Sequence, residues 1–412
     1  MRKPSPSMKR PLSLFTALAV ILSLSAGITG CSARTPKDAP ESSVSKSSVS
    51  ETAALTASAS ETESGEKSVS ETPVSKTTAM ETTTAEVSPA QTTPPNISAP
   101  AEPDSKTPVT VTDQLGREVV ISQKPETIIS GYYISSSLLI ALGQADRVAG
   151  VEAQAEKRPI YGLAAPKLLD LPGVGTVKEL DLELCASLEP DLVIIPAKLK
   201  EKIPAMEELG LTVLVVDPEN RQLMKEMTGL LGTATYSRET AQRLIDATDK
   251  LSADLRTALA TVLEKEEKPT VYLGGNSSFF STAGPSMYQH SLIEQAGGEN
   301  VAASLSDSYW SKISYEQLLA WDPDYIILAA NAAYSVDSIL ADEQLAECAA
   351  VKNGHVYQIP GQIEAWDSPV PGSVLGSLWL ASVLHPEACS PARYQQAVTA
   401  FYEEFYGFTP EI

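Results

Sequence analysis

The 412-residue sequence has few histidines and cysteines, the side chains from which most zinc sites are built. It contains three histidines, four cysteines and no Cys-x-x-Cys pair. His290 and His385 fall on expected helices, and His355 follows Asn-Gly in an expected turn. Because zinc and manganese sites need several such ligands close together, we expect no metal ligands in this protein.

The cysteines that follow residue 31 are odd in number: Cys185, Cys348 and Cys389. An odd count means that at least one of them is a free thiol, and no disulfide framework is indicated. We interpret all three as small, buried apolar side chains. The sequence leaves their pairing state open.

The motifs of the common enzyme classes are also missing. No Gly-x-Ser-x-Gly, His-Glu-x-x-His, phosphate-loop or Gly-x-Gly-x-x-Gly pattern occurs. Gly274-Gly275 follows an expected strand but lacks the third glycine of a nucleotide loop. We therefore predict that the protein is not an enzyme, has no catalytic residue and carries no cofactor.

Basic residues are scarce relative to acidic ones. The chain has 31 Lys and Arg against 52 Asp and Glu, and its formal net charge is -21. Nucleic-acid binding requires a basic surface that neutralises phosphates. The charge balance therefore excludes nucleic acid as an expected partner.

The first thirty residues have the order of a secretory signal peptide. Basic residues at positions 2, 3, 9 and 10 precede an apolar run over 12–28, and Ile28-Thr29-Gly30-Cys31 closes it. This closing segment resembles the lipobox of bacterial lipoproteins. The resemblance implies cleavage before Cys31, a lipid on its thiol and anchoring at the extracellular face of the bacterial cell membrane. The alternative is a retained transmembrane helix, for which the run is short.

Residues 31–107 have the composition of a tether. Ser, Thr, Ala, Pro and Glu dominate this segment, and large apolar residues are almost absent. Such a segment cannot bury enough apolar surface to fold, so we predict a disordered linker behind the lipidated Cys31. A sticky or glycosylated stalk is the alternative.

The remaining 300 or so residues alternate strand and helix patterns, which indicates an α/β fold with mainly parallel sheets. A continuous 3.6-residue apolar period over 237–266, without Gly or Pro, predicts one helix roughly 45 Å long. We expect this helix, over 236–267, to join an N-terminal lobe (108–235) to a C-terminal lobe (268–412). The alternative is an ordinary buried helix within one domain.

The segments on either side of this helix match each other. Glu183 and Glu316 each lie seven residues before a Pro-Asp pair that opens an apolar strand. The correspondence suggests two lobes of similar construction.

Ligands of parallel α/β sheets bind at the carboxyl ends of the strands, so the loops that follow the strands are the candidate site. Aromatic and polar side chains gather there, and they suit a bulky organic ligand. The candidate ligand-binding residues are Tyr132, Tyr133, Ser135, Lys198, Asn276, Phe279, Phe280, Trp310, Tyr334 and Trp366.

Four short patterns, in this order, resemble those of one family. They are Val-Thr-Asp113-x-x-Gly116-Arg117-x-Val, Leu182-Glu183-x4-Leu188-x-Pro190-Asp191, Glu294-Gln-Ala-Gly-Gly-Glu-Asn300, and Leu378-Trp-Leu-Ala381 with His385-Pro386-Glu387. Through them, residues 109–405 resemble the substrate-binding proteins of ABC importers for ferric siderophores, haem and vitamin B12. The resemblance implies a cleft between two lobes and a monomer that delivers its ligand to a membrane permease with its ATPase. It also implies that Glu183 and Glu316, one acid on each lobe, dock onto arginines of that permease.

The predicted ligand is an iron complex (a ferric hydroxamate siderophore or haem) or a corrinoid. Few basic residues are expected in the cleft, which disfavours highly anionic catecholates. Haem could be held by Tyr132 or Tyr133. Two alternatives are a receptor for a metal oxyanion such as molybdate, which the acidic surface would repel at long range, and a lipoprotein for surface adhesion or wall interaction.

Overall fold

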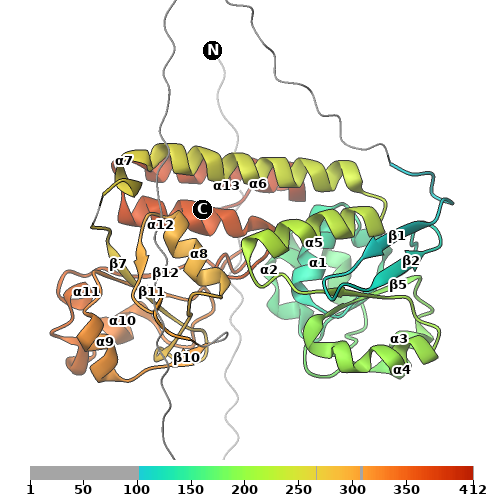
Figure 1. Ribbon diagram of the computed structural model, residues 1–412, viewed down its shortest axis with the longest axis horizontal. Helices are drawn as coiled ribbons and strands as arrows, with labels where there is room; N and C mark the ends of the chain where they lie inside the picture. The colour runs from blue at the N-terminus through green and yellow to red at the C-terminus, as the bar shows by residue number, and fades with distance from the viewer. Residues whose placement is uncertain (1–101, 266, 307–309, 412) are drawn as a thin grey trace, which may run out of the picture. The chain divides into compact units, whose positions relative to one another are not determined.

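The computed structural model describes residues 102–265, 267–306 and 310–411. They form two α/β lobes joined by a long helix, α6 (Arg238–Ala258), which confirms the predicted fold class (Figure 1). The predicted signal peptide, Cys31 and the tether up to residue 101 lie outside the described residues. Within the described residues, no helix is both long and apolar enough to cross a membrane.

The N-terminal lobe is built on a four-stranded parallel sheet with the strand order β4-β3-β5-β6. Its strands are β3 (Ile128–Ser130), β4 (Val148–Val151), β5 (Leu192–Pro196) and β6 (Val213–Val216), and an antiparallel hairpin of β1 (Val109–Thr112) and β2 (Glu118–Ile121) precedes them. The hairpin turns at Gly116, whose φ of 81° favours glycine.

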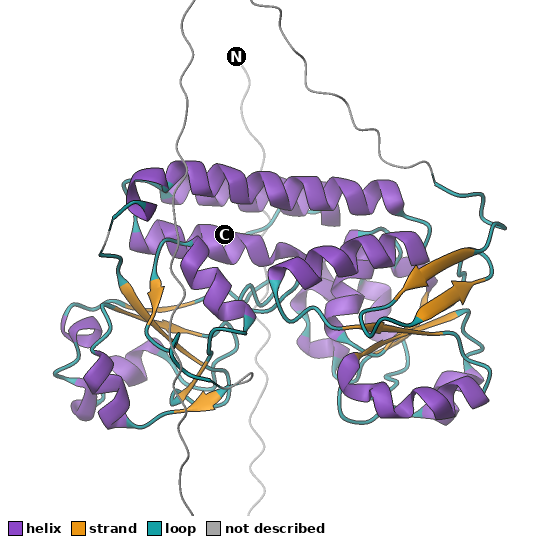
Figure 2. Ribbon diagram, viewed as in Figure 1, coloured by secondary structure: helices purple, strands orange, loops and turns teal. Residues whose placement is uncertain are grey.

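Helices flank this sheet (Figure 2). They are α1 (Tyr133–Ala141), α2 (Pro159–Ala164), α3 (Leu182–Ser187), α4 (Ile203–Glu208) and α5 (Arg221–Ala234), with the short 3-10 helices η1 (Ala145–Arg147), η2 (Ala155–Lys157), η3 (Pro166–Asp170) and η4 (Ala197–Lys202). The sequence predicted a loop over 131–137, but α1 already begins at Tyr133. The sequence interpretation also did not identify α5.

The C-terminal lobe has a mixed sheet with the order β10-β8-β7-β11-β12, and β9 pairs with β7. Its strands are β7 (Thr270–Gly274), β8 (Ser281–Thr282), β9 (Glu299–Asn300), β10 (Ser311–Lys312), β11 (Tyr325–Leu328) and β12 (Val356–Gln358). The central strands β7, β11 and β12 are parallel, whereas β8 and β10 are antiparallel.

The helices of this lobe are α8 (Tyr288–Gln295), α9 (Tyr315–Trp321), α10 (Val336–Leu340), η5 (Glu343–Leu345), α11 (Ala349–Lys352), η6 (Pro371–Ser373), α12 (Val374–Leu384) and α13 (Pro391–Tyr406). One helix was expected over 337–347, but α10 ends at Leu340. Asp342 then caps the separate 3-10 turn η5 by accepting a bond from the Gln344 backbone N–H.

The connecting helix is shorter than predicted. A turn at Leu259 separates α6 from α7 (Ala260–Leu263), so the expected thirty-residue helix is interrupted. Ser237 occupies the N-cap position, but its hydroxyl pairs with the Thr235 hydroxyl at 2.8 Å and does not cap the helix. The apolar face that the sequence predicted is buried at Ala241, Leu244 and Leu255.

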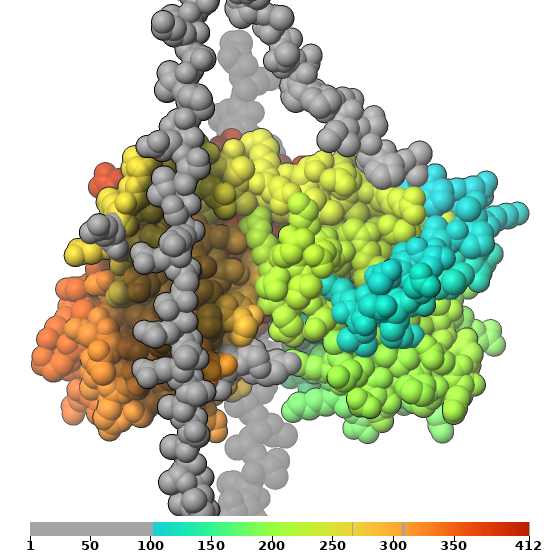
Figure 3. Space-filling view, in the orientation of Figure 1, coloured from blue at the N-terminus to red at the C-terminus, as the bar shows by residue number. Residues whose placement is uncertain are grey.

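One apolar core is continuous through both lobes. It includes Ile128 of the N-terminal sheet, Leu244 and Leu255 of α6, and Leu292 and Leu375 of the C-terminal lobe. In the space-filling view, the two lobes lie on opposite sides below the yellow connecting helix (Figure 3). Because buried apolar surface stabilises packed elements, this shared core restricts the relative movement of the lobes.

The three described cysteines are buried and unpaired, as expected of small apolar side chains. Burial raises the pKa of the Cys185 thiol to about 11, so this thiol is protonated and unreactive at neutral pH.

Candidate binding cleft

A hollow lies between the lobes, where the loops after parallel strands approach each other. Its empty volume is about 330 Å³. The N-terminal lobe contributes Tyr133, Ser137, Lys157, Arg158, Pro159 and Ile160, and the C-terminal lobe contributes Asn331, Gly361, Ile363, Glu364, Ala365 and Val370. These residues follow β3, β4, β11 and β12, so the hollow lies at the ends of strands, as is typical of ligand sites in parallel α/β sheets.

The N-terminal wall combines aromatic rings with an arginine. Tyr132 and Tyr133 meet edge to face with ring centroids 5.3 Å apart. The Arg158 guanidinium lies 4.0 Å from the centre of the Tyr133 ring, within the range of a cation–π contact. Among the described residues, no group accepts a hydrogen bond from Arg158 Nε. The Nε atom is buried, whereas the Arg158 side chain as a whole is 31% exposed, so its positive charge can attract an anionic group of a ligand.

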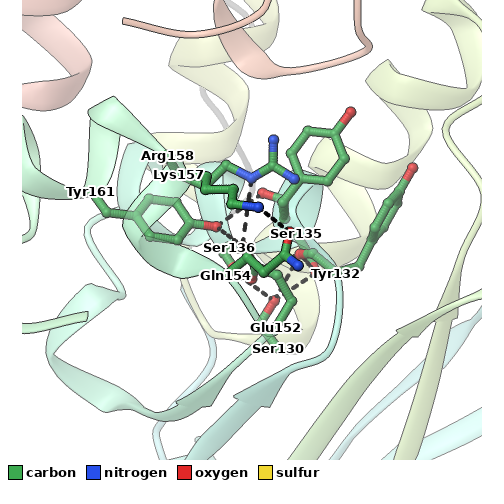
Figure 4. A network of polar contacts seen from close by, with 10 residues as sticks. Ser130, Tyr132, Ser135, Ser136, Glu152, Gln154, Lys157, Arg158 and Tyr161 are labelled. Carbon is green, nitrogen blue, oxygen red and sulfur yellow. Dashed lines mark hydrogen bonds and ion pairs between the residues drawn. The ribbon is translucent and has the colours of Figure 1, made fainter. Parts of the chain in front are cut away.

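A buried carboxylate supports this wall from below (Figure 4). Glu152 accepts hydrogen bonds of 2.7 Å from the Tyr161 hydroxyl and of 2.7 Å from the Ser136 hydroxyl. Its Oε1 lies 4.0 Å from Arg158 Nε, too far for a hydrogen bond. Burial raises the pKa of Glu152, while the two hydroxyls act in the opposite direction. Glu152 thus orients Arg158 electrostatically without occupying its Nε–H.

On the C-terminal side there are two buried carboxyl groups, Glu364 in the lining of the hollow and Asp367 three residues later. Glu364 accepts bonds from Tyr402 at 3.0 Å and from Tyr406 at 3.1 Å, and burial raises its pKa to about 7. Asp367 Oδ2 accepts a bond of 3.2 Å from the Ala330 N–H, and burial raises the pKa of Asp367 to about 6. Asp367 Oδ1 finds no partner among the described residues.

The candidate ligand-binding residues of the N-terminal lobe differ in their exposure and in their contacts. Tyr133 lines the hollow, and the Tyr132 ring packs against the Tyr133 ring. Ser135 is buried, and its hydroxyl donates to the Tyr132 carbonyl at 2.7 Å. Lys198 is exposed in η4. Burial raises the pKa values of the nearby Asp217 and Glu219, and the charge of Lys198 acts in the opposite direction.

In the C-terminal lobe, two candidates form a small aromatic shelf after β7. The Tyr334 hydroxyl donates to the Gly275 carbonyl at 2.7 Å. The Trp310 ring packs so closely on Gly275 that a Cβ there would lie 2.8 Å from ring atoms. Asn276 is exposed in the following loop.

The structure assigns two other candidates to the core of the C-terminal lobe. Phe279 is 7% exposed, and its ring meets Tyr272 and Tyr334 edge to face. Trp366 is 2% exposed, and its Nε1–H donates to the Tyr402 hydroxyl at 2.9 Å. Phe280 is half-buried, with its ring centroid 4.3 Å from that of Tyr315. Burial therefore removes Phe279 and Trp366 from the exposed cleft wall.

The sequence interpretation noted Arg158, Glu364 and Asp367 in loops that follow strands but did not select them as ligand-binding residues, and it did not mention Glu152 or Lys157. Each follows β4 or β12 in the chain, so position after a strand was an available signal. Charged residues of these types usually lie exposed in loops. Glu152 and Glu364 differ from that expectation because they are buried, which the sequence does not show. Within the described residues, no group of His, Cys, Asp and Glu is arranged to hold a metal ion.

Related sequences share this architecture. A family described as periplasmic binding protein matches residues 128–363. The molybdate-binding protein MolA of Haemophilus influenzae is 23% identical over 320 residues, which cover 72% of this chain and 90% of MolA. The petrobactin-binding protein YclQ of Bacillus subtilis is 27% identical over 272 residues, which cover 62% of this chain and 81% of YclQ.

Solved structures have the same two-lobed fold. A periplasmic solute binding protein from Veillonella parvula matches with a TM-score of 0.66 at 25% identity, over 74% of this chain and 94% of that one. MolA bound to molybdate matches with a TM-score of 0.66 at 22% identity, over 74% of this chain and 99% of that one. Since the family match spans more than half of the sequence, the protein belongs to the periplasmic binding protein family.

Proposed function

We propose that the protein is the lipid-anchored receptor of an ABC importer, held at the extracellular face of the cell membrane through Cys31. It captures an iron complex or a corrinoid between its lobes and delivers this ligand to a permease. The observation that carries the proposal is the pair of Tyr133 and Arg158 in the lining of the inter-lobe hollow, where an aromatic ring lies beside a guanidinium. Relatives named for petrobactin and vitamin B12 support this ligand class.

Capture requires binding groups and no bond chemistry. The tyrosine rings offer flat apolar surface to an organic ligand. The guanidinium of Arg158, which is 31% exposed, attracts an anionic oxygen of the ligand. Asn331 on the facing wall is exposed and adds an amide to the same hollow. The continuous core behind the cleft limits how far the lobes can close on the ligand.

A metal oxyanion such as molybdate is the second candidate, and the basic side chains that line the hollow favour it. Lys157 and Arg158 line this space and would attract a small anion. The relative MolA is named for molybdate binding.

Calorimetric titration of the purified protein with a ferric hydroxamate, haemin, cobalamin and molybdate tests both candidates. We expect saturable binding of one of them at micromolar concentration or below. Arg158→Met should weaken an anionic ligand by roughly 10- to 100-fold, since a charge-assisted hydrogen bond is lost. Lys200→Met, an exposed lysine of η4, is the control that should leave affinity unchanged. Absence of binding by all four compounds would refute the proposed ligand classes.

A further inference from the structure

Arg221 contacts three separate parts of the molecule. It is the first residue of α5, in the N-terminal lobe. Its Nη1 donates to Gln295 Oε1 of the C-terminal lobe at 2.6 Å. Its Nη2 donates to the Thr248 carbonyl of the connecting helix at 3.0 Å and also contacts the Ser252 hydroxyl. One guanidinium therefore bridges both lobes and the helix between them.

The α5 helix itself gives no reason for an arginine at this position. Asn220 already caps the helix, because its side chain accepts a 3.0 Å bond from the Leu223 N–H. A positive charge in the first turn is unfavourable to the helix dipole. Every acceptor that Arg221 reaches lies outside α5. The compensating interactions therefore come from the contact between the lobes.

The acceptors are themselves held in place. Gln295 is the last residue of α8, and its Oε1 also accepts a bond of 3.4 Å from Ser377 of α12. In α6, the Ser252 hydroxyl donates to the Thr248 carbonyl at 2.8 Å. Anchored acceptors give the planar guanidinium one favourable position. A lysine could not reproduce this geometry, because its ammonium is a single point of charge.

Arg221 is also close in sequence to the binding cleft. It follows the loop after β6, which carries Asp217 and Glu219. The charges of both acids act on the Tyr132 hydroxyl in the cleft wall. Only residues 217–220 separate Arg221 from the end of β6.

We propose that Arg221 is a positioning residue that fixes the separation of the two cleft walls by tying α5 to α8 and α6. It acts on the lobes and not on the ligand, and its test needs no ligand. Failure to find a ligand would count against the proposed function alone, whereas failure of the following test would count against Arg221 alone.

The test measures the distance between the lobes in the full protein by pulsed electron paramagnetic resonance. Spin labels attached to a genetically encoded keto amino acid at positions 187 (α3) and 317 (α9) leave the cysteines untouched, and both positions are exposed. We expect one narrow distance distribution in the parent protein. Arg221→Met should widen it roughly twofold, and Arg221→Lys should restore it only in part.

Two further variants make the outcome decisive. Gln295→Met removes the acceptor on the C-terminal lobe without changing charge, so it should widen the distribution as well. Arg393→Met is the matched control, because Arg393 donates to the Asp254 carbonyl and ties α6 to the C-terminal lobe only. Parental widths in both Arg221→Met and Gln295→Met would overturn the proposal. If Arg221→Met fails to fold, Gln295→Met decides by itself.

Discussion

Asp191 and Asp324 make the same contact in the two lobes. Asp191 Oδ2 accepts bonds from the Glu126 and Thr127 backbone N–H groups at 2.8 and 3.0 Å. Asp324 Oδ2 accepts bonds from the Thr270 N–H and hydroxyl, both at 2.8 Å. Each aspartate thereby joins the start of its own strand to the start of the neighbouring strand. The Pro-Asp pairs of the sequence thus mark an equivalent structural position in each lobe.

This equivalence extends to the helices that carry the proposed docking acids. Glu183 and Glu316 are each exposed at the second position of a short helix, α3 or α9. A bond from Ser314 lowers the pKa of Glu316, so this carboxylate is ionised at neutral pH. Charge reversal of both acids to Arg should reduce uptake in cells roughly tenfold or more, because docking would now bring like charges together. Ligand affinity of the purified variant should not change.

The control for this experiment is charge reversal of Glu226 and Glu404, which are exposed on α5 and α13. It changes the net charge by the same amount at other positions and should preserve uptake. Normal uptake by the Glu183→Arg/Glu316→Arg variant would show that these acids do not dock the permease.

Gly275 lies directly beneath the Trp310 ring. A methyl group at this position would lie 2.8 Å from ring atoms and 3.0 Å from the Ser281 carbonyl oxygen. Gly275→Ala should therefore displace Trp310, shift its fluorescence and destabilise the fold by about 1–3 kcal/mol. Gly229→Ala is the matched control in α5, where no atom lies within 4 Å of the added methyl. It should raise the stability by about 0.5–1 kcal/mol in urea unfolding. Equal effects of the two substitutions would contradict the packing argument.

Glu364 should make the stability of the protein depend on pH. Burial raises its pKa from 4.5 to about 7, so between these values the folded state binds a proton that the unfolded state releases. The contribution of Glu364 is therefore complete below about pH 4.5 and is lost as the pH rises through about 7, to a total of roughly 3 kcal/mol. Urea unfolding at pH 5 and pH 8 should show this fall.

Glu364→Gln should reduce the difference in unfolding free energy between pH 5 and pH 8. A part should remain, because burial also raises the pKa of Asp367 to about 6, with the same sign. Glu343→Gln, at an exposed site in η5, should leave the difference intact. An undiminished pH dependence in Glu364→Gln would mean that other groups cause it.

Glu152 and Tyr161 should behave as a coupled pair. Tyr161→Phe removes the hydroxyl that donates to Glu152 Oε1 at 2.7 Å and leaves a buried carboxylate with one donor fewer. We expect a loss of about 1–3 kcal/mol in thermal or urea unfolding. In the double variant Tyr161→Phe/Glu152→Gln, the loss of unfolding free energy should be smaller than the sum of the two single losses, since both substitutions affect the same hydrogen bond. Full additivity would show that the hydroxyl and the carboxylate act independently.

Local sequence determined the main strands of this protein. Alternating strand and helix patterns predicted the parallel strands β3, β5, β7 and β11, because buried parallel strands need continuous apolar runs. Gly116 predicted a turn that only glycine adopts easily. Matched Glu and Pro-Asp spacing predicted two lobes, and the equivalent contacts of Asp191 and Asp324 agree with it. These signals are contained within short windows of the chain, where backbone preference and periodicity act.

Only the tertiary structure decided which loop side chains face the cleft. The sequence interpretation placed Trp366 in a cleft loop. In the structure the Trp366 side chain is buried, and its indole N–H donates a hydrogen bond to the hydroxyl of Tyr402, 36 positions later. Arg221 and Gln295 are 74 positions apart, and no spacing rule relates them. Exposure and long-range pairing depend on how helices such as α13 pack against distant loops. That packing minimises exposed apolar area over the whole fold, which no single stretch of sequence specifies.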